Sequence, residues 1–131
     1  MATVNLKDAK SEVMDGMDNV VIVNYFDGIR GGRSLNVEGF TPTVINAGHV
    51  IIKLSSGDYA PMPLNSSANA YAALPEGASY AGYLVASIPT KKPFAGIMVR
   101  GTINPKAAPF AMDSILAALK EALPLVDFQE E

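Results

Sequence analysis

The side chains that could act in catalysis are few, and His49 is the first of them. It is the single histidine among 131 residues, and the chain has no cysteine. A catalytic zinc site usually takes two or three nitrogen or sulfur ligands, so only carboxylates would remain to complete one. A serine nucleophile would need His49 as its base, and no G-x-S-x-G turn is present. The sequence therefore predicts a structural or exposed role for His49, with a pH-sensitive contact as the alternative.

Paired carboxylates are the other groups that could do acid–base chemistry. The candidate pairs are Asp15 with Asp18, Asp58 with Glu76, and Glu130 with Glu131. They fall in predicted loops and termini, where a carboxylate is ordinarily solvated. Dinucleotide, calcium-loop and kinase signatures do not occur. The sequence predicts a binding or assembly module rather than an enzyme, with no cofactor and no metal.

The glycine-rich stretch from Gly28 to Arg33, GIRGGR, does not have the spacing of a phosphate-binding loop. A single copy is also a poor RNA-binding segment. We interpret it as a glycine turn carrying two solvated arginines. In the functional alternative, Arg30 and Arg33 contact acidic groups on a partner protein.

Composition narrows the class of protein further. The formal charge of −3 gives no basic face for a phosphate backbone, so nucleic acid is not an expected partner. No apolar run approaches the roughly 20 residues of a membrane span, and the charged start lacks the apolar core of a signal peptide. We expect a soluble protein made in the cytoplasm, with one domain of this length.

Most of the strand signal lies between Ala47 and Asn104, and one clear strand pattern precedes this stretch. Residues 1–18 form either a short amphipathic helix or an arm that orders on binding. The apolar run Val20–Phe26 predicts a strand that is buried on both faces or covered on one by a neighbouring chain. His49–Leu54 and Tyr59–Met62 form a predicted hairpin, and Pro61 places its second strand at a sheet edge.

The second half begins with an irregular segment. Leu64–Ala78 is either a functional surface loop or contains one helical turn at Ala68–Leu74. Strands are predicted at Gly82–Ile88 and Ala95–Ile103. The connection Pro89–Pro93 places two prolines and two lysines where they blunt a sheet edge.

One helix is predicted near residues 110–123, followed by an extended piece at Leu125–Phe128. Gly101, inside a strand pattern, indicates a bulge or a close backbone approach. The expected fold is mainly β with one C-terminal helix (α+β). It would be a small β-sandwich or barrel-like domain over residues 19–131, with a flexible N-terminal arm at 1–18.

The order of four motifs is characteristic: AGHVIIKL, GDYAPMP, YAGYLVASI and MVRGTIN, before a Pro-bracketed loop, a terminal helix and a short strand. This order resembles the head decoration, or auxiliary capsid, proteins of tailed bacteriophages. The likeness is to the lambda type and to the crAss-like and Bacteroides phages, and it covers about residues 41–128. The N-terminal region through Phe40 is longer than in the lambda-type pattern.

The resemblance implies a structural virion protein on the capsid exterior that cements neighbouring major capsid subunits, in some cases as a homotrimer. The partner would be the major capsid protein, with no nucleic acid and no membrane. Alternatives are a head-fibre base, a tail-associated β module or, less favoured, a small-ligand-binding β-barrel. The candidate capsid or subunit contacts are Arg30, Arg33, Tyr71, Leu74, Phe94 and Phe110.

Overall fold

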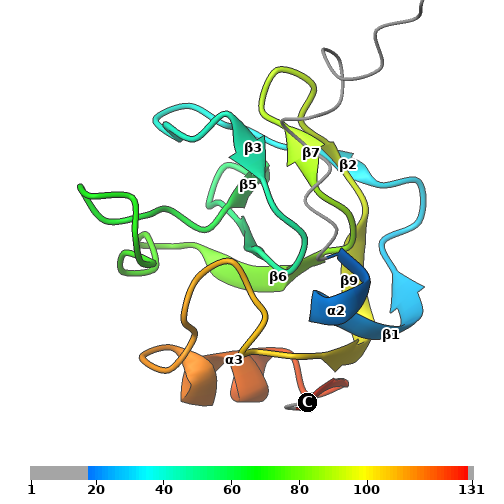
Figure 1. Cartoon of the computed structure of the whole chain (residues 1–131). Coiled ribbons are helices and arrows are strands. Elements are labelled where there is room, and N and C mark those ends of the chain that lie inside the picture. Colours follow the sequence, from blue (N-terminus) through cyan, green and yellow to red (C-terminus); the bar gives the residue numbers. More distant parts are fainter. Residues whose placement is uncertain (1–17, 130–131) are drawn as a thin grey trace, which may run out of the picture.

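The computed structural model describes residues 18–129, and strands dominate it (Figure 1). Strands account for 37% of the chain and helices for 9%, so the expected mainly β, α+β class is confirmed. The sheets are open rather than closed into a barrel. The predicted arm at residues 1–18 lies outside the described residues, apart from Asp18.

One six-stranded sheet organises the molecule, in the order β1-β9-β6-β4-β5 with β10 also beside β9. Its strands are β1 (Ile22–Gly28), β4 (Val50–Lys53), β5 (Tyr59–Pro61), β6 (Ser79–Leu84), β9 (Ile97–Ile103) and β10 (Val126–Phe128). All neighbours pair antiparallel except β10, which runs parallel to β9. The predicted β4–β5 hairpin is confirmed, and β5 with its Pro61 is an edge strand.

Two small sheets complete the β structure of the described part of the chain. β2 (Arg33–Ser34) pairs with β8 (Phe94–Ala95), and β3 (Val44–Ile45) pairs with β7 (Ile88–Pro89). The predicted strands Gly82–Ile88 and Ala95–Ile103 are therefore each divided between the main sheet and a small one. The division occurs because Ile88 and Ala95 find partners in the segment between β1 and β4 rather than in β9 or β6.

The first predicted strand needs correction at its start and in its burial. Val20 and Val21 belong to a helical turn, α2 (Asp18–Val21), and β1 begins at Ile22. Burial on both faces is wrong, because residues 24–27 are exposed. Among the strands of residues 18–129, β1 is an edge strand that pairs with β9 alone, and register shifts interrupt their pairing. Bulges of this kind twist a sheet edge away from regular pairing.

Gly101 is a site of close backbone approach, as predicted. It lies opposite Tyr25 in the β1–β9 pair, where a Cβ atom would collide with the carbonyl oxygen of Asn24. Only glycine leaves room for the two strands at this position.

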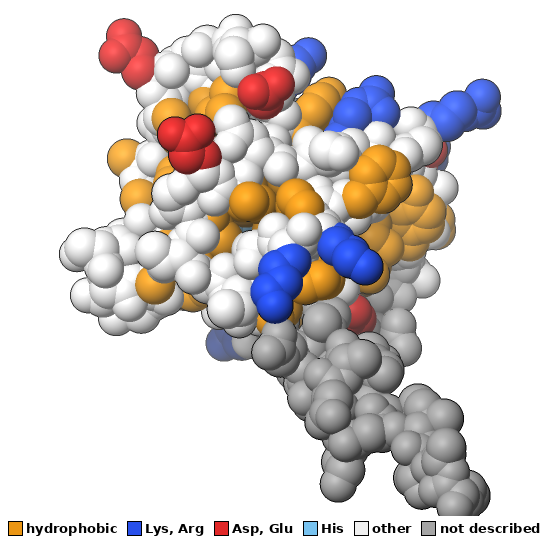
Figure 2. All heavy atoms as spheres, turned by 90° about the horizontal axis from the view of Figure 1, so that it is seen from above, with side chains coloured by type: hydrophobic (Ala, Val, Ile, Leu, Met, Phe, Trp, Pro, Cys, Tyr) orange, Lys and Arg blue, Asp and Glu red, His pale blue; other side chains and the backbone are white. Residues whose placement is uncertain are grey.

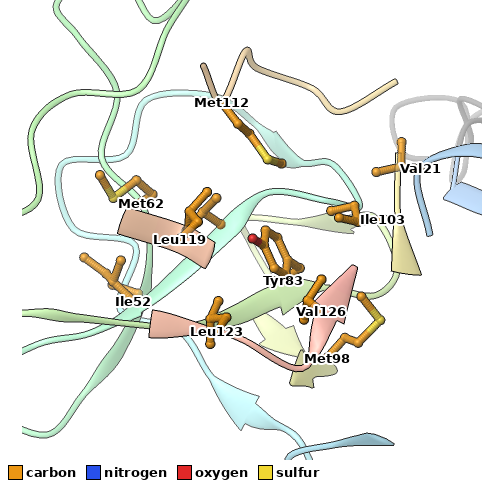
Figure 3. Close-up of a cluster of buried hydrophobic side chains, with 12 residues drawn as sticks. Val21, Ile52, Met62, Tyr83, Met98, Ile103, Met112, Leu119, Leu123 and Val126 are labelled. Carbon is orange, nitrogen blue, oxygen red and sulfur yellow. The ribbon is translucent and has the colours of Figure 1, made fainter. Parts of the chain in front are cut away.

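The core lies on both faces of the main sheet. Successive residues of one strand point to opposite faces, so Ile51 and Ile52 of β4 belong to different clusters, as do Tyr83 and Leu84 of β6. The first cluster is covered by α3 (Leu116–Ala122), whose Leu119 is buried above the sheet (Figure 3). Three methionines in it, Met62, Met98 and Met112, fill irregular space around the Tyr83 ring.

The helical elements are shorter than the sequence predicts. α3 begins at Leu116 rather than near residue 110, and Ile115 at its N-terminus supplies no side-chain cap. Leu64–Ala78 contains no helix; a bridge between Leu64 and Tyr71 closes it as a loop instead. The short extended piece before the C-terminus is confirmed as β10. None of the described helices is long and apolar enough to span a membrane.

Candidate functional site

The six predicted contact residues fall into two separate places. Arg30, Arg33 and Phe94 are exposed around the turn that follows β1. Tyr71 and Phe110 instead surround His49, and Leu74 packs against the first core cluster.

His49 is buried inside a cage of three aromatic rings. The rings of Phe40, Tyr71 and Phe110 lie with centroids 5.4, 5.1 and 5.6 Å from that of His49, each nearly perpendicular to it. His49 Nε2 is 2.9 Å from the carbonyl oxygen of Met62, to which the neutral ring donates its proton. These contacts give His49 a structural role, in agreement with the first of the two predicted roles.

The cage also sets the protonation of its members. Burial lowers the pKa of His49 to about 4, against a smaller opposing effect of the Met62 carbonyl. His49 Nδ1 has no hydrogen-bond partner within residues 18–129. Burial raises the pKa of Tyr71, whose hydroxyl accepts a hydrogen bond from the Val50 N–H at 3.1 Å. Tyr71 therefore contacts residues within the domain, His49 and Val50.

Large exposed apolar side chains occur on β1, directly before it, on β8 and directly before β10. Five large hydrophobic residues are between 45% and 65% exposed: Val20, Tyr25, Phe26, Phe94 and Leu125. Val20 directly precedes β1, and the Leu125 carbonyl accepts a hydrogen bond from Gly101, the residue opposite Tyr25. We call Tyr25, Phe26 and Phe94 with these two neighbours the aromatic edge.

Two glycines hold the rings of the aromatic edge in place. The Tyr25 ring lies against Gly28, and the Phe94 ring atoms are 3.1 and 3.2 Å from the position that a Cβ of Gly32 would take. Gly28 also approaches the carbonyl of Ile97, and Gly32 that of Ala95. Without a Cβ atom, Gly28 and Gly32 each leave room for one of these rings. Gly32 has a φ of +69°, which agrees with the predicted glycine turn.

The two arginines lie at the end of the aromatic edge. Arg33 Nη1 donates to the carbonyls of Arg30 and Gly32 at 3.1 and 2.6 Å, and its guanidinium lies 5.7 Å from the centre of the Tyr59 ring. Neither arginine forms an ion pair with a described carboxylate. Figure 2 shows hydrophobic side chains gathered on the side of the molecule that carries β1 and β2, with basic side chains around them.

A groove of about 600 Å³ opens beside the other edge of the sheet. We call it the loop groove; its walls are Asn36, Glu38, Gly39, Phe40, Thr41, Pro42, Ile52, Leu54, Ala60, Pro61, Pro63, Leu64, Asn65, Ser66 and Pro75. Sequence reasoning identified Pro61 as an edge residue but missed the groove, because its walls come from four separate stretches of the chain, 36–42, 52–54, 60–66 and Pro75.

The paired carboxylates do not assemble into a described acid–base site. Asp18 accepts hydrogen bonds from the N–H and hydroxyl of Ser87 at 3.0 and 2.7 Å, and so ties α2 to the bend after β6. Asp58 and Glu76 are exposed, and Asp15, Glu130 and Glu131 lie outside the described residues. Within residues 18–129 no group of three or more His, Asp or Glu side chains is placed to hold a metal ion.

The exposed rings and arginines have the chemistry of a docking surface, since aromatic side chains and arginine are enriched at protein interfaces. Comparison with protein-family models, curated proteins and solved structures finds no match for the chain. The aromatic edge is therefore the candidate functional site on physical grounds.

Proposed function

We propose that the protein is a structural component of a bacteriophage virion that binds the outer surface of the capsid and cements neighbouring major capsid subunits. In this proposal it is made in the host cytoplasm, acts without catalysis or cofactor, and assembles with the major capsid protein, with a homotrimer as one possible arrangement of its copies. The aromatic edge is the observation that carries the proposal. The motif order of residues 41–128 supports the choice of a capsid as the partner.

The size of the aromatic edge indicates how such a protein would bind. Fully covering one exposed aromatic side chain contributes roughly 1.5–3 kcal/mol. Association itself costs about 4–15 kcal/mol in lost freedom of motion. Five side chains that are only about half exposed would therefore contribute about as much as association costs, so a single contact would be weak. A symmetric shell that engages several contacts of one assembly at once would raise the avidity without a larger surface on each copy.

The glycine supports make the surface suitable for this role. Because the Tyr25 and Phe94 rings already lie against Gly28 and Gly32, docking would immobilise few additional rotamers. A pre-organised surface binds more tightly than a mobile one of equal area. Arg30 and Arg33 at its end would meet carboxylates of the capsid and set the orientation of the protein.

Co-sedimentation with purified, expanded heads of the phage tests the proposal. We expect the protein to pellet with heads at a fixed number of copies and to raise the temperature at which they open. Failure to bind intact heads at saturating protein would contradict it. Immunogold labelling of virions separates the related possibilities, because a head-fibre base or a tail module would label a fibre or the tail instead of the whole shell.

A further inference from the structure

The loop groove combines an apolar floor with a single charge. Ile52 and Ala60 are buried in its floor, and four of its wall residues are prolines, which have no backbone N–H to offer a ligand. Glu38 is the only charged residue among the walls. The groove therefore favours an occupant that has an apolar surface and carries a positive charge.

The two asparagine side chains of the groove walls are engaged in hydrogen bonds within the domain. Asn36 Oδ1 accepts a hydrogen bond from the Glu38 N–H at 3.0 Å. The side-chain amide of Asn65 bonds to Asn69, donating to Oδ1 at 2.8 Å and accepting from the N–H at 3.1 Å. No cation of residues 18–129 forms an ion pair with the Glu38 carboxylate. Glu38 is thus the groove-wall group that can offer a charge to a cationic partner, beside the hydroxyl groups of Thr41 and Ser66.

The chain itself presents an exposed segment with the complementary chemistry. Thr90–Pro93, which joins β7 to β8, carries Lys91 and Lys92 between two prolines, and both lysines are exposed. We call this segment the lysine hairpin. Hydrogen bonds from Lys92 N–H to the Pro89 carbonyl and from Phe94 N–H to the Lys92 carbonyl, at 3.1 and 2.8 Å, fix its shape.

The lysine hairpin lies beside the loop that forms one groove wall. Leu35 N–H donates to the Pro93 carbonyl at 2.7 Å, and Thr90 N–H donates to the Thr43 carbonyl at 2.9 Å. Leu35 and Thr43 flank the wall residues 36–42, so the positive segment and the negative groove are neighbours on the surface. In Figure 2, acidic side chains lie on one part of the visible face and most basic ones on another.

We propose that the lysine hairpin of one copy docks into the loop groove of a second copy of this chain. Every copy then donates one hairpin and receives one, which is satisfied in a two-fold pair or in a closed ring. Lys91 or Lys92 meets Glu38, and the prolines and aliphatic lysine stems cover the apolar floor. This contact goes beyond capsid binding and does not depend on it.

Charge-swap variants test the contact by sedimentation velocity. We expect the wild-type protein to self-associate, and E38K or K91E/K92E to weaken the association at least roughly tenfold, because each variant sets like charges against each other. The combined variant E38K/K91E/K92E should recover the association. E121K, which makes the same charge change on exposed α3, is the matched control and should behave as wild type.

A wild-type protein that stays monomeric at about 0.1 mM, a concentration at which contacts of millimolar affinity begin to populate, would overturn the proposal. So would a combined variant that does not recover, or an E121K variant as weakened as E38K. An equal mixture of E38K and K91E/K92E associates if the assembly is a pair, since both mixed contacts are attractive, and the measured mass gives the number of copies. Head binding is measured separately, so its loss leaves this result intact.

Discussion

At the scale of single residues, the folded chain gives His49 and two glycines their roles. A lone histidine at the start of an apolar strand pattern predicts little more than the choice between a buried and an exposed ring. In the fold, His49 is buried by the rings of residues 40, 71 and 110, which are distant from it in sequence. No local pattern connects them, so the cage could not be predicted. The glycine turn could be predicted from the sequence, because glycines favour the positive φ that such a turn requires.

Protonation of His49 should destabilise the fold in acid. Its pKa is about 4 in the folded protein and about 6.5 when exposed, so the unfolded chain binds the proton more readily. The contribution of neutral His49 to the free energy of unfolding is complete above about pH 6.5 and is lost as the pH falls toward 4. At 1.36 kcal/mol per pKa unit, the loss is about 3 kcal/mol at most. Urea unfolding between pH 7.5 and 4 measures this loss. The free energy of unfolding of H49Q should depend less on pH than that of the wild type. An unchanged profile in H49Q would contradict the assignment.

Gly32 should tolerate alanine less well than its neighbour Gly31. Both have a positive φ, +69° and +79°, so both substitutions cost about 1–2 kcal/mol in backbone strain. A Cβ at Gly31 would meet nothing within 4 Å, whereas at Gly32 it would lie 2.7 Å from the Ala95 carbonyl oxygen and against the Phe94 ring. We expect G32A to unfold at lower urea than G31A. Equal midpoints would show that Gly32 does not support the ring.

At the scale of elements, apolar runs located the strands but not their places in the sheet. The run Val20–Phe26 has the composition of a central strand, yet β1 is an edge strand with exposed rings. Composition cannot distinguish a strand covered by its own domain from one covered by a partner. The apolar stripe correctly located the helix in the sequence. Its first residue could not be predicted, since no side-chain cap marks the start of the helix.

α3 should depend on packing rather than on its own propensity, because seven residues are too few for an independent helix. Leu119 is the buried residue of this helix. L119A should lower the free energy of unfolding by about 2–5 kcal/mol. A118S, at an exposed position one residue away, should change it by less than about 0.5 kcal/mol. Chemical denaturation measures both, and similar values for the two variants would contradict the packing argument.

At the scale of the whole molecule, two surfaces of different chemistry remain after the core is filled. The aromatic edge lies at the β1 end of the sheet, and the loop groove lies near β5 at the other. The mainly β class was predictable from composition and turns. The groove was not, because it arises where loops that are separate in sequence converge. The net charge of −3 does not show how charges are distributed, since Arg30, Arg33, Lys91 and Lys92 are all exposed.

Binding of an aromatic-edge variant to purified heads tests the central claim most directly. Tyr25 and Phe26 are exposed, so Y25S/F26S should keep the fold, which circular dichroism and the unfolding midpoint check. We predict that this variant loses head binding by more than about tenfold. E121S, on exposed α3, should bind as the wild type does. If Y25S/F26S pellets with heads at the wild-type affinity, the aromatic edge is not the capsid contact.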